Sequence, residues 1–342
     1  MKPSVLFVTE TFLKYGGVET RVRMYAEAYR RKGWNVYIKP TIYRAGYERK
    51  LFDLGNNCFV NTCLLLFWSV IKKIKIIEYQ SGSEEDVRFF PRVLHFFGIK
   101  LGIVFHGKAG ENLLKKINLF DYSLCVSEIQ KIRQQALSSC VVVPNALPRC
   151  INKWKWANQS RALYISRLDE DKRPSLEAFV SFCLKFKVKM DIAGEGYLLE
   201  ELKRKMEEKY GAETIHFLGG INTMSFLKKS IEKYLFIGGI GNVALEALSV
   251  GYPVLVSPLV GKENCFFVKE TNYEKLRFCN FSPHNRLEII NFEQDVRNVK
   301  QDIINLHDGK SGETCLSPKI ISQKYDFDAV FERYWLEIVC IK

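Results

Sequence analysis

Short apolar runs alternate with helical segments along the whole chain. The first run, at 4–9, is followed by a helical pattern at 18–32 that places Val22, Tyr25 and Tyr29 on one face and stops at Gly33. Buried strands that alternate with helices are typical of parallel sheets covered on both faces. The pattern predicts further strands at 34–38, 75–79, 102–105, 122–126, 139–143, 162–166, 189–193, 214–218, 234–237 and 253–257.

The alternation is interrupted once, by the polar segment 148–160. This segment contains Trp154 and Trp156, and we interpret it as a linker with exposed tryptophans. The sequence therefore predicts an α/β protein with two doubly wound parallel-sheet domains, at 1–150 and 151–325. The remaining segment, 326–342, reads as an aromatic-rich helix whose apolar face needs a partner.

Length and charge narrow the class of protein. A chain of 342 residues accommodates two domains, and 47% hydrophobic and 26% charged residues are ordinary for a globular protein. Of the net charge of +13, residues 1–150 carry 23 basic against 12 acidic side chains, which leaves 28 against 26 for the rest. This bias indicates an anionic partner for the first half. Because no zinc-finger, RNA-recognition or KH signature is present, we expect no nucleic acid and consider an anionic membrane surface instead.

Cysteine usage and hydropathy point to a cytoplasmic protein. The ten cysteines form no C-x-x-C pair, which argues against zinc and for reduced thiols, and the N-terminus does not resemble a signal peptide. The longest apolar stretch, 59–71, is too short to span a bilayer and runs into Lys72, Lys73 and Lys75. Such a segment is either a basic helix on the inner face of a membrane or a core helix with a solvated lysine end.

A glycine-rich turn at 238–246 carries the strongest chemical signal. An apolar run ends in Gly238, Gly239 and Gly241, and a helical stretch that contains Glu246 follows. Backbone N–H groups at a helix start approach an anion closely, and the helix dipole favours negative charge there. Glu246, one to two turns inside the helix, is placed to accept hydrogen bonds from a ribose. The pattern predicts a nucleotide site, although a turn that binds nothing has the same composition.

A basic pair follows an earlier strand of the same half. Arg167 comes directly after the strand at 162–166, and Lys172 follows five residues later. Two cations at one strand end suit a diphosphate, because Arg offers a forked contact and Lys a mobile point charge. The alternative is a solvated loop neutralised by its own acidic residues at 169–171.

The order of these motifs resembles that of the retaining glycosyltransferases of family 4, which have the GT-B fold. In the second half the order is Arg167 and Lys172, A-G-E-G at 193–196, F-L-G at 217–219, G-x-G…Glu at 239–246 and G-x-P-V at 251–254. The first half adds G-G-V-E-T at 16–20, F-H-G at 105–107, F-D-Y at 120–122, V-S-E at 126–128 and V-P-N at 143–145. The resemblance covers most of the chain.

The resemblance implies a role for each matching residue. Catalysis would involve His106, which contacts the donor sugar, and Arg167 and Lys172, which neutralise the departing diphosphate. Binding of the donor would involve Gly16, Gly17, Gly239, Gly241, Asn242, Val243 and Glu246. The two domains would face each other across a cleft, with the helix at 326–342 packed back on the first. No metal is implied, and no cofactor beyond the nucleotide sugar itself.

Two positions depart from the family pattern. The family has two glutamates eight positions apart, and Gly238 stands at the earlier one, which contacts the donor sugar. Gly107 stands where an aspartate usually accompanies the histidine. An unusual donor sugar, other sugar-binding groups or a loss of activity would each explain Gly238.

The resemblance implies a retaining glycosyltransferase that moves a sugar from a UDP- or GDP-linked donor to a glycan or lipid-linked acceptor, in the assembly of bacterial surface polysaccharide or lipopolysaccharide. A non-catalytic, nucleotide-binding partner subunit is one alternative. A nucleotide-sugar 2-epimerase on the same fold is another, but it needs several acid–base groups, and the chain has five histidines. We expect a cytoplasmic protein, with a peripheral position on the inner face of the membrane as the further possibility raised by the basic first domain.

Overall fold

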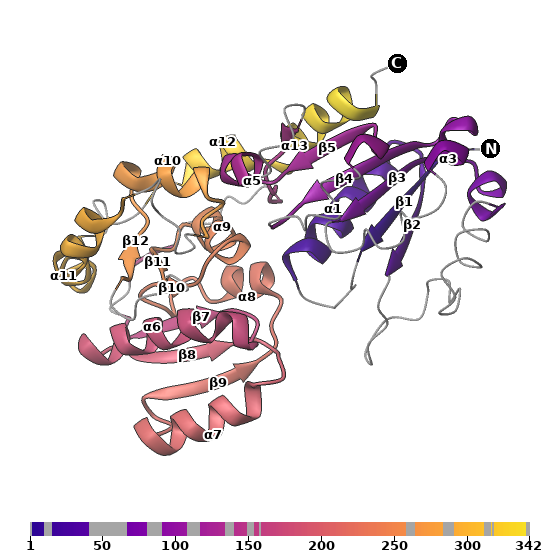
Figure 1. Cartoon of the computed structure of the whole chain (residues 1–342). Coiled ribbons are helices and arrows are strands. Elements are labelled where there is room, and N and C mark those ends of the chain that lie inside the picture. The colour runs from indigo at the N-terminus through magenta and orange to yellow at the C-terminus, as the bar shows by residue number, and fades with distance from the viewer. Residues whose placement is uncertain are drawn as a thin grey trace. The chain divides into compact units, whose positions relative to one another are not determined.

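The computed structural model describes residues 2–9, 16–40, 67–80, 91–107, 117–133, 140–148, 154–156, 159–257, 264–282, 291–310, 316 and 318–339. The chain divides into two compact units (Figure 1). The N-terminal unit comprises Met1–Asn145 and Asp328–Lys342, and the C-terminal unit comprises Ala146–Phe327. Each unit is built around its own sheet.

The sheet of the N-terminal unit has six parallel strands in the order β2-β1-β3-β4-β5-β6. They are β1 (Ser4–Thr9), β2 (Asn35–Pro40), β3 (Ile74–Gln80), β4 (Lys100–Phe105), β5 (Tyr122–Cys125) and β6 (Val141–Val142). The chain runs from β1 outward to β2 and then returns to the other side of β1 with β3. The direction of winding therefore changes between β1 and β3, and at such a point the carboxyl ends of the strands leave room for a ligand.

The helices of this unit include one that comes from the far end of the chain. They are α1 (Gly17–Arg31), α3 (Pro91–Phe96), α5 (Glu128–Arg133), the 3-10 turn η2 (Ile117–Leu119), α13 (Phe327–Tyr334) and the π-helical turn η5 (Trp335–Val339). The aromatic face of α13 packs on α1, with the Tyr25 ring 4.9 Å from that of Tyr334 and 5.5 Å from that of Phe331. Aromatic pairs at these distances stabilise by about 0.5–1.5 kcal/mol beyond burial. The partner of the C-terminal aromatic face is therefore α1.

The sheet of the C-terminal unit has the order β12-β11-β10-β7-β8-β9. Its strands are β7 (Arg161–Ile165), β8 (Lys189–Ala193), β9 (Ile215–Gly219), β10 (Ile237–Gly238), β11 (Val254–Val256) and β12 (Phe266–Phe267). Five are parallel, and β12 runs antiparallel to β11 at the edge. The direction of winding changes between β7 and β10, since β8 and β9 lie on one side of β7 and β10 and β11 on the other.

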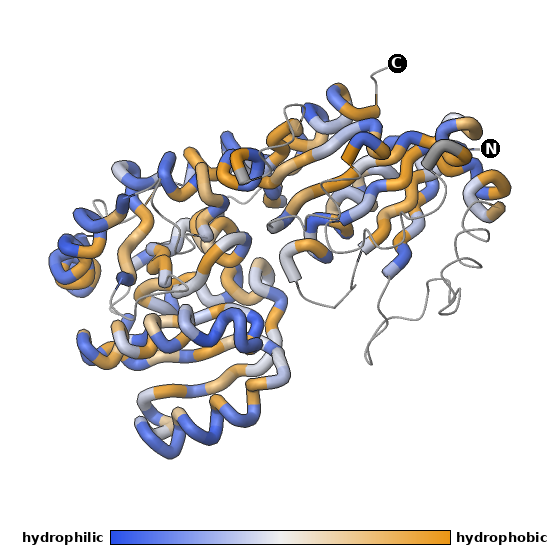
Figure 2. Tube along the Cα trace, viewed as in Figure 1, coloured by the Kyte–Doolittle hydropathy of each residue, from blue (hydrophilic) through white to orange (hydrophobic). Residues whose placement is uncertain are grey.

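Helices of the C-terminal unit turn their apolar faces toward this sheet, as the alternating colours of Figure 2 show along α6 and α7. The helical elements are η3 (Glu170–Lys172), α6 (Arg173–Lys185), α7 (Leu199–Tyr210), α8 (Thr223–Lys229), α9 (Asn242–Val250), α10 (Glu270–Phe278), α11 (Glu293–His307) and α12 (Pro318–Tyr325). The core includes Phe179, Phe182, Phe236 and Phe267, and all four side chains are buried.

The predicted α/β class with two parallel sheets is confirmed, but the interpretation of both tryptophans at 148–160 as exposed linker residues is wrong. Trp154 is buried, and its indole Nε1 donates a hydrogen bond to the Tyr234 carbonyl at 2.9 Å. Trp156 is 42% exposed. A buried indole satisfies its single N–H donor, so Trp154 anchors this segment to the C-terminal unit.

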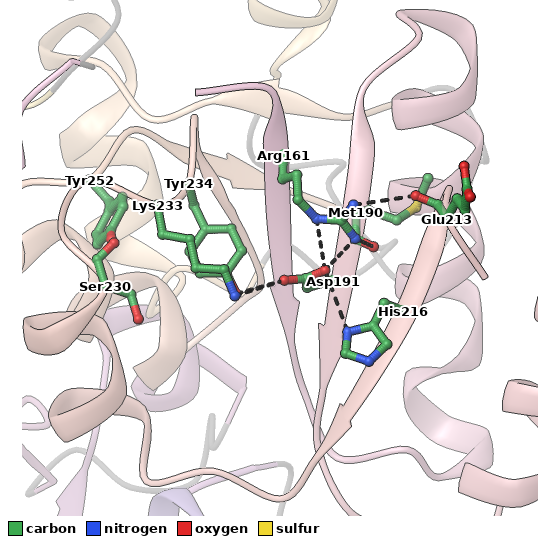
Figure 3. A network of polar contacts seen from close by, with 9 residues as sticks. All are labelled: Arg161, Met190, Asp191, Glu213, His216, Ser230, Lys233, Tyr234 and Tyr252. Carbon is green, nitrogen blue, oxygen red and sulfur yellow. Dashed lines mark hydrogen bonds and ion pairs between the residues drawn. The ribbon is translucent and has the colours of Figure 1, made fainter. Parts of the chain in front are cut away.

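A polar network ties the amino ends of the strands of the C-terminal unit together (Figure 3). The buried Asp191 carboxylate accepts hydrogen bonds from the Arg161 guanidinium and, at 2.8 Å, from the Tyr234 hydroxyl, and Lys233 lies 3.3 Å away. A buried carboxylate needs such partners to offset its desolvation. Because Arg161 begins β7 and Tyr234 precedes β10, the network stands at the strand starts and serves the fold.

Candidate functional site

Two sequence-predicted elements meet at the point where the winding of the C-terminal sheet changes. Arg167 follows the end of β7, and the glycine turn follows the end of β10. These strands are neighbours, with Ile237 opposite Leu163 and Gly238 opposite Tyr164. Their carboxyl ends therefore lie side by side, at the position where open α/β sheets bind ligands. The basic pair and the glycine turn, each weak evidence alone, therefore form one candidate site.

Two of the glycine amides predicted to hold phosphate are engaged in the fold. The Gly239 N–H donates to the Leu255 carbonyl at 3.2 Å, and the Gly241 N–H donates to the Phe281 carbonyl at 2.8 Å. Each amide carries one hydrogen, so in this state neither is available to a ligand. The two glycines shape the turn here, and binding of the donor by their amides stays a prediction. Gly241 adopts a φ of 61°, which favours glycine, at the N-cap of α9.

The first turn of α9 follows the glycine turn directly. Asn242 and Val243 are its first two residues. The positive end of the helix dipole lies at the same place. Gly239 leaves space here, since a Cβ on it would lie 2.6 Å from a Val243 methyl group and 3.2 Å from the Ile165 carbonyl oxygen.

Gly238 belongs to the buried core. It is the last residue of β10, and a Cβ built on it would collide with the Phe179 ring of α6. In this chain the position of the family's earlier glutamate therefore points into the space between the sheet and a helix. A carboxylate at this position would conflict with the core packing, and no side chain fits at 238 unless Phe179 moves.

Arg167 and Lys172 converge on one carboxylate. Arg167 Nη2 lies 3.2 Å from Asp171 Oδ2, Lys172 Nζ lies 3.0 Å from the same oxygen, and Arg167 Nη1 lies 2.7 Å from Asp169 Oδ2. Burial acts to raise the pKa of Asp171, but the hydrogen bond and charge of Lys172 and the charge of Arg167 lower it overall. Because the Arg167 side chain is 48% exposed, each pair contributes only about 0–1 kcal/mol, which an incoming dianion can replace.

Glu246 lies in the second turn of α9 and faces the start of α8. Burial raises the pKa of its carboxyl to about 7, and a hydrogen bond with Thr223 partly opposes this rise. A glutamate with this pKa is about half ionised at neutral pH. Hydroxyl donors such as those of a ribose would stabilise the ionised form, so binding at this residue is coupled to proton release.

The predicted glycines of the N-terminal unit precede its first helix. Gly16 is the N-cap of α1 and accepts a hydrogen bond from the Thr20 N–H at 3.0 Å. A Cβ on Gly16 would collide with the Glu19 carboxyl, which folds back over it. Gly17 is the first helical residue. The glycine at 16 therefore leaves room for the Glu19 carboxyl.

His106 follows β4 and contacts the end of the neighbouring strand β3. Its Nε2 lies 2.7 Å from Gln80 Oε1, and Gln80 Nε2 donates to Glu78 Oε1 at 3.0 Å. Burial, and secondarily the charge of Arg21, lower the pKa of His106 to about 3, so the ring is neutral under physiological conditions. Sequence reasoning missed Glu78 and Gln80, although two polar side chains at the end of an otherwise apolar strand were a signal.

The basic segment considered for membrane contact is exposed where the structure describes it. Lys72, Lys73 and Lys75 are exposed, as are Phe67 (67%) and Ile71 (50%), whereas the part of this segment at 59–66 lies outside the described residues. Among the helices described, none combines the length and the apolar character that crossing a bilayer requires.

Comparisons with known proteins bear on both units. Residues 151–272 match the family model of glycosyl transferases group 1. Solved structures match nearly the whole chain at low identity. HepE of Anabaena in complex with UDP-glucose matches at 13% identity and a TM-score of 0.69, over 99% of this chain and all of the other. TarM matches at 13% and 0.68, over 98% of each chain. The lipopolysaccharide outer core galactosyltransferase WaaB matches at 13% and 0.63, over 98% of this chain and 99% of the other. No curated protein sequence matches the chain.

Structural likeness at this level of sequence identity shows the fold alone. The family match lies within the C-terminal unit. The matches to solved structures cover both sheets of this chain. The chain therefore has the GT-B fold of glycosyltransferases, and its residues 151–272 match the model of glycosyl transferases group 1.

Proposed function

We propose that the protein is a retaining, metal-independent glycosyltransferase that moves a sugar from a UDP-linked donor to a glycan or lipid-linked acceptor. The observation that carries the proposal is the meeting of Arg167, Lys172 and the start of α9 at the carboxyl ends of β7 and β10. The preference for UDP over GDP is supported by HepE, whose structures contain UDP, glucose or UDP-glucose. A setting in bacterial surface polysaccharide or lipopolysaccharide assembly is supported by WaaB.

In this proposal the C-terminal unit stabilises the leaving group. The bond between the sugar and the diphosphate breaks as the acceptor oxygen bonds to the anomeric carbon, and UDP takes the electron pair of the broken bond. Arg167 and Lys172 leave Asp171 for the diphosphate, and the first-turn amides of α9 add their N–H groups. Prepositioned charges of this kind provide the largest share of catalysis in many enzymes. The acceptor proton passes to the departing phosphate oxygen.

His106 acts in this proposal as a neutral group. With a pKa of about 3 its ring carries no charge near pH 7, so it contributes hydrogen bonding to the donor sugar and does not repel positive charge that develops at the anomeric carbon. Activity should therefore show no titration of His106 between about pH 5 and pH 9.

Glu246 gives UDP affinity a distinctive pH dependence. Since its pKa is about 7 in the unliganded protein, lowering the pH from about 8 to about 6 reduces the ionised fraction, and we expect UDP affinity to fall about tenfold. Calorimetric titration of the wild type and of Glu246→Gln across this range measures the effect. The titration of UDP itself is common to both proteins, so their difference isolates Glu246.

Thermal melting distinguishes the effect of pH on folding stability from its effect on UDP affinity. The raised pKa means that the folded, unliganded protein holds this proton more tightly than the unfolded chain, so the contribution of Glu246 to stability decreases as the pH rises through 7. Affinity and stability thus change in opposite directions with pH. Equal pH slopes of affinity in the two proteins would contradict the ribose role.

A donor panel tests the proposed function itself. The full-length protein is incubated with UDP- and GDP-sugars, and released nucleotide is measured with glycan acceptors and with lipid-linked acceptors in vesicles that contain phosphatidylglycerol. We expect release from a UDP-sugar and retention of the anomeric configuration in the product. Faster transfer in anionic than in neutral vesicles would support membrane contact through Lys72, Lys73 and Lys75. UDP binding without turnover of any donor would favour the non-catalytic partner subunit.

A further inference from the structure

A buried relay of hydrogen bonds leads from the C-terminal helix of the N-terminal unit to His106. The Tyr334 hydroxyl donates to Glu78 Oε2 at 2.8 Å and lies 2.9 Å from the Tyr29 hydroxyl. The Tyr122 hydroxyl donates to the same carboxylate oxygen at 3.2 Å. The other oxygen, Oε1, accepts from Gln80. Glu78, which is 1% exposed, thus receives donors from three elements of the fold.

The directions of these hydrogen bonds follow from the chemistry of the groups. A carboxylate only accepts, so the Gln80 amide must turn its NH2 group toward Glu78. The Gln80 carbonyl oxygen then faces His106, at 2.7 Å from Nε2. Because an amide oxygen also only accepts, the ring nitrogen opposite it must carry the proton. The neutral imidazole is therefore protonated on Nε2, with its lone pair on Nδ1.

We propose that Glu78 and Gln80 are positioning residues that fix the tautomer and the orientation of His106, in place of the carboxylate that Gly107 cannot supply. The inference rests on the proposed function of His106 toward the donor sugar. It adds two residues that do not contact the substrate themselves and act through the imidazole.

The other groups around the ring fit this arrangement. From α1, the buried Arg21 guanidinium contributes a positive charge that opposes protonation of His106, and it lies 4.1 Å from the centre of the Tyr25 ring. From α5, Gln130 Nε2 donates to the His106 carbonyl at 3.3 Å, and this contact does not involve the imidazole. Gln80 alone among these three side chains hydrogen-bonds the ring in the contacts described, and it is the position to vary.

Two substitutions at Gln80 separate positioning from simple stability. Gln80→Leu removes the acceptor opposite Nε2, and we expect kcat to fall about 10- to 100-fold while KM changes less than about twofold. Gln80→Glu provides a carboxylate instead, which favours the protonated ring, so kcat acquires a pH dependence that the wild type lacks. Gln130→Leu is the matched control, since it removes a contact to the His106 backbone only, and we expect kcat within about threefold of the wild type.

Nitrogen-15 NMR of histidine-labelled protein reads the tautomer directly. The His106 signals are identified by their absence in His106→Gln. We expect protonation on Nε2 in the wild type and in Gln130→Leu, and a mixture of tautomers in Gln80→Leu. Protonation on Nδ1 in the wild type, or unchanged spectra and kcat in Gln80→Leu, would overturn the proposal. UDP affinity is measured in every variant and reports on the C-terminal unit. A wild-type protein that does not bind UDP would instead count against the proposed function.

Discussion

Replacement of both Arg167 and Lys172 by alanine is expected to lower kcat at least about 10³-fold, because loss of a single preorganised charge-stabilising group commonly costs 10²- to 10³-fold. The two side chains meet at Asp171 in the unliganded protein, and the same geometry delivers two positive charges to one diphosphate. Neither contributes much to folding, since exposed ion pairs are worth about 0–1 kcal/mol. The measurement is steady-state release of UDP from the donor identified in the panel.

The neighbouring Arg173 provides the matched control. The substitution Arg173→Ala removes a positive charge from the same segment. The guanidinium that it removes pairs with Glu170 at 3.2 Å and with Glu201 at 3.4 Å, and not with Asp171. We expect Arg173→Ala to retain kcat within about threefold and all variants to melt within a few degrees of the wild type. A double variant with wild-type kcat would refute the assignment of these residues to the leaving group.

Introduction of the family's glutamate at position 238 is expected to destabilise the C-terminal unit rather than to improve catalysis. The side chain of Gly238→Glu would enter the space occupied by the Phe179 ring and bury a carboxylate without a partner. We expect a loss of about 3 kcal/mol or more of stability for Gly238→Glu and about 1–3 kcal/mol for Gly238→Ala, measured by denaturant unfolding.

A second substitution tests the cause of this loss. Phe179→Leu replaces the ring by a smaller side chain. In the Gly238→Ala background it should restore part of the stability that Gly238→Ala loses, which gives a favourable coupling energy in the double-mutant cycle. Gly107→Ala is the control, because a Cβ there meets no atom within 4 Å. A stable Gly238→Glu protein with faster turnover would show that the position belongs to the sugar site after all.

Local patterns in the sequence predicted the elements but not the contacts that define their roles. The strands at 4–9 and 189–193 were predicted with the bounds observed, because short apolar runs bounded by polar residues determine buried strands directly. The engaged amides of Gly239 and Gly241 could not be predicted, since their acceptors, Leu255 and Phe281, are brought to the turn by the fold. The burial of Trp154 depends in the same way on a distant carbonyl, that of Tyr234.

For the candidate residues too, the sequence predicted the residue types but not their surroundings. The types and spacing of Arg167, Lys172 and Glu246 suggested an anion and a ribose, and the sheet order then placed the basic pair beside the glycine turn. The pKa of Glu246 and the neutrality of His106 arise from burial and neighbouring charge, which sequence alone does not give. Gly238 was interpreted through family comparison as a missing ligand group, whereas the structure explains it by the Phe179 ring.

The hydrogen bond between Tyr334 and Glu78 also sets the order in which the protein can be completed on the ribosome. The two residues are 256 positions apart, so Glu78 cannot receive this donor until synthesis has passed Tyr334. The whole C-terminal unit, continuous from Ala146 to Phe327, lies between them in the sequence. The N-terminal unit, although its strands are translated first, is therefore completed only after every strand and helix of the C-terminal unit has been synthesised.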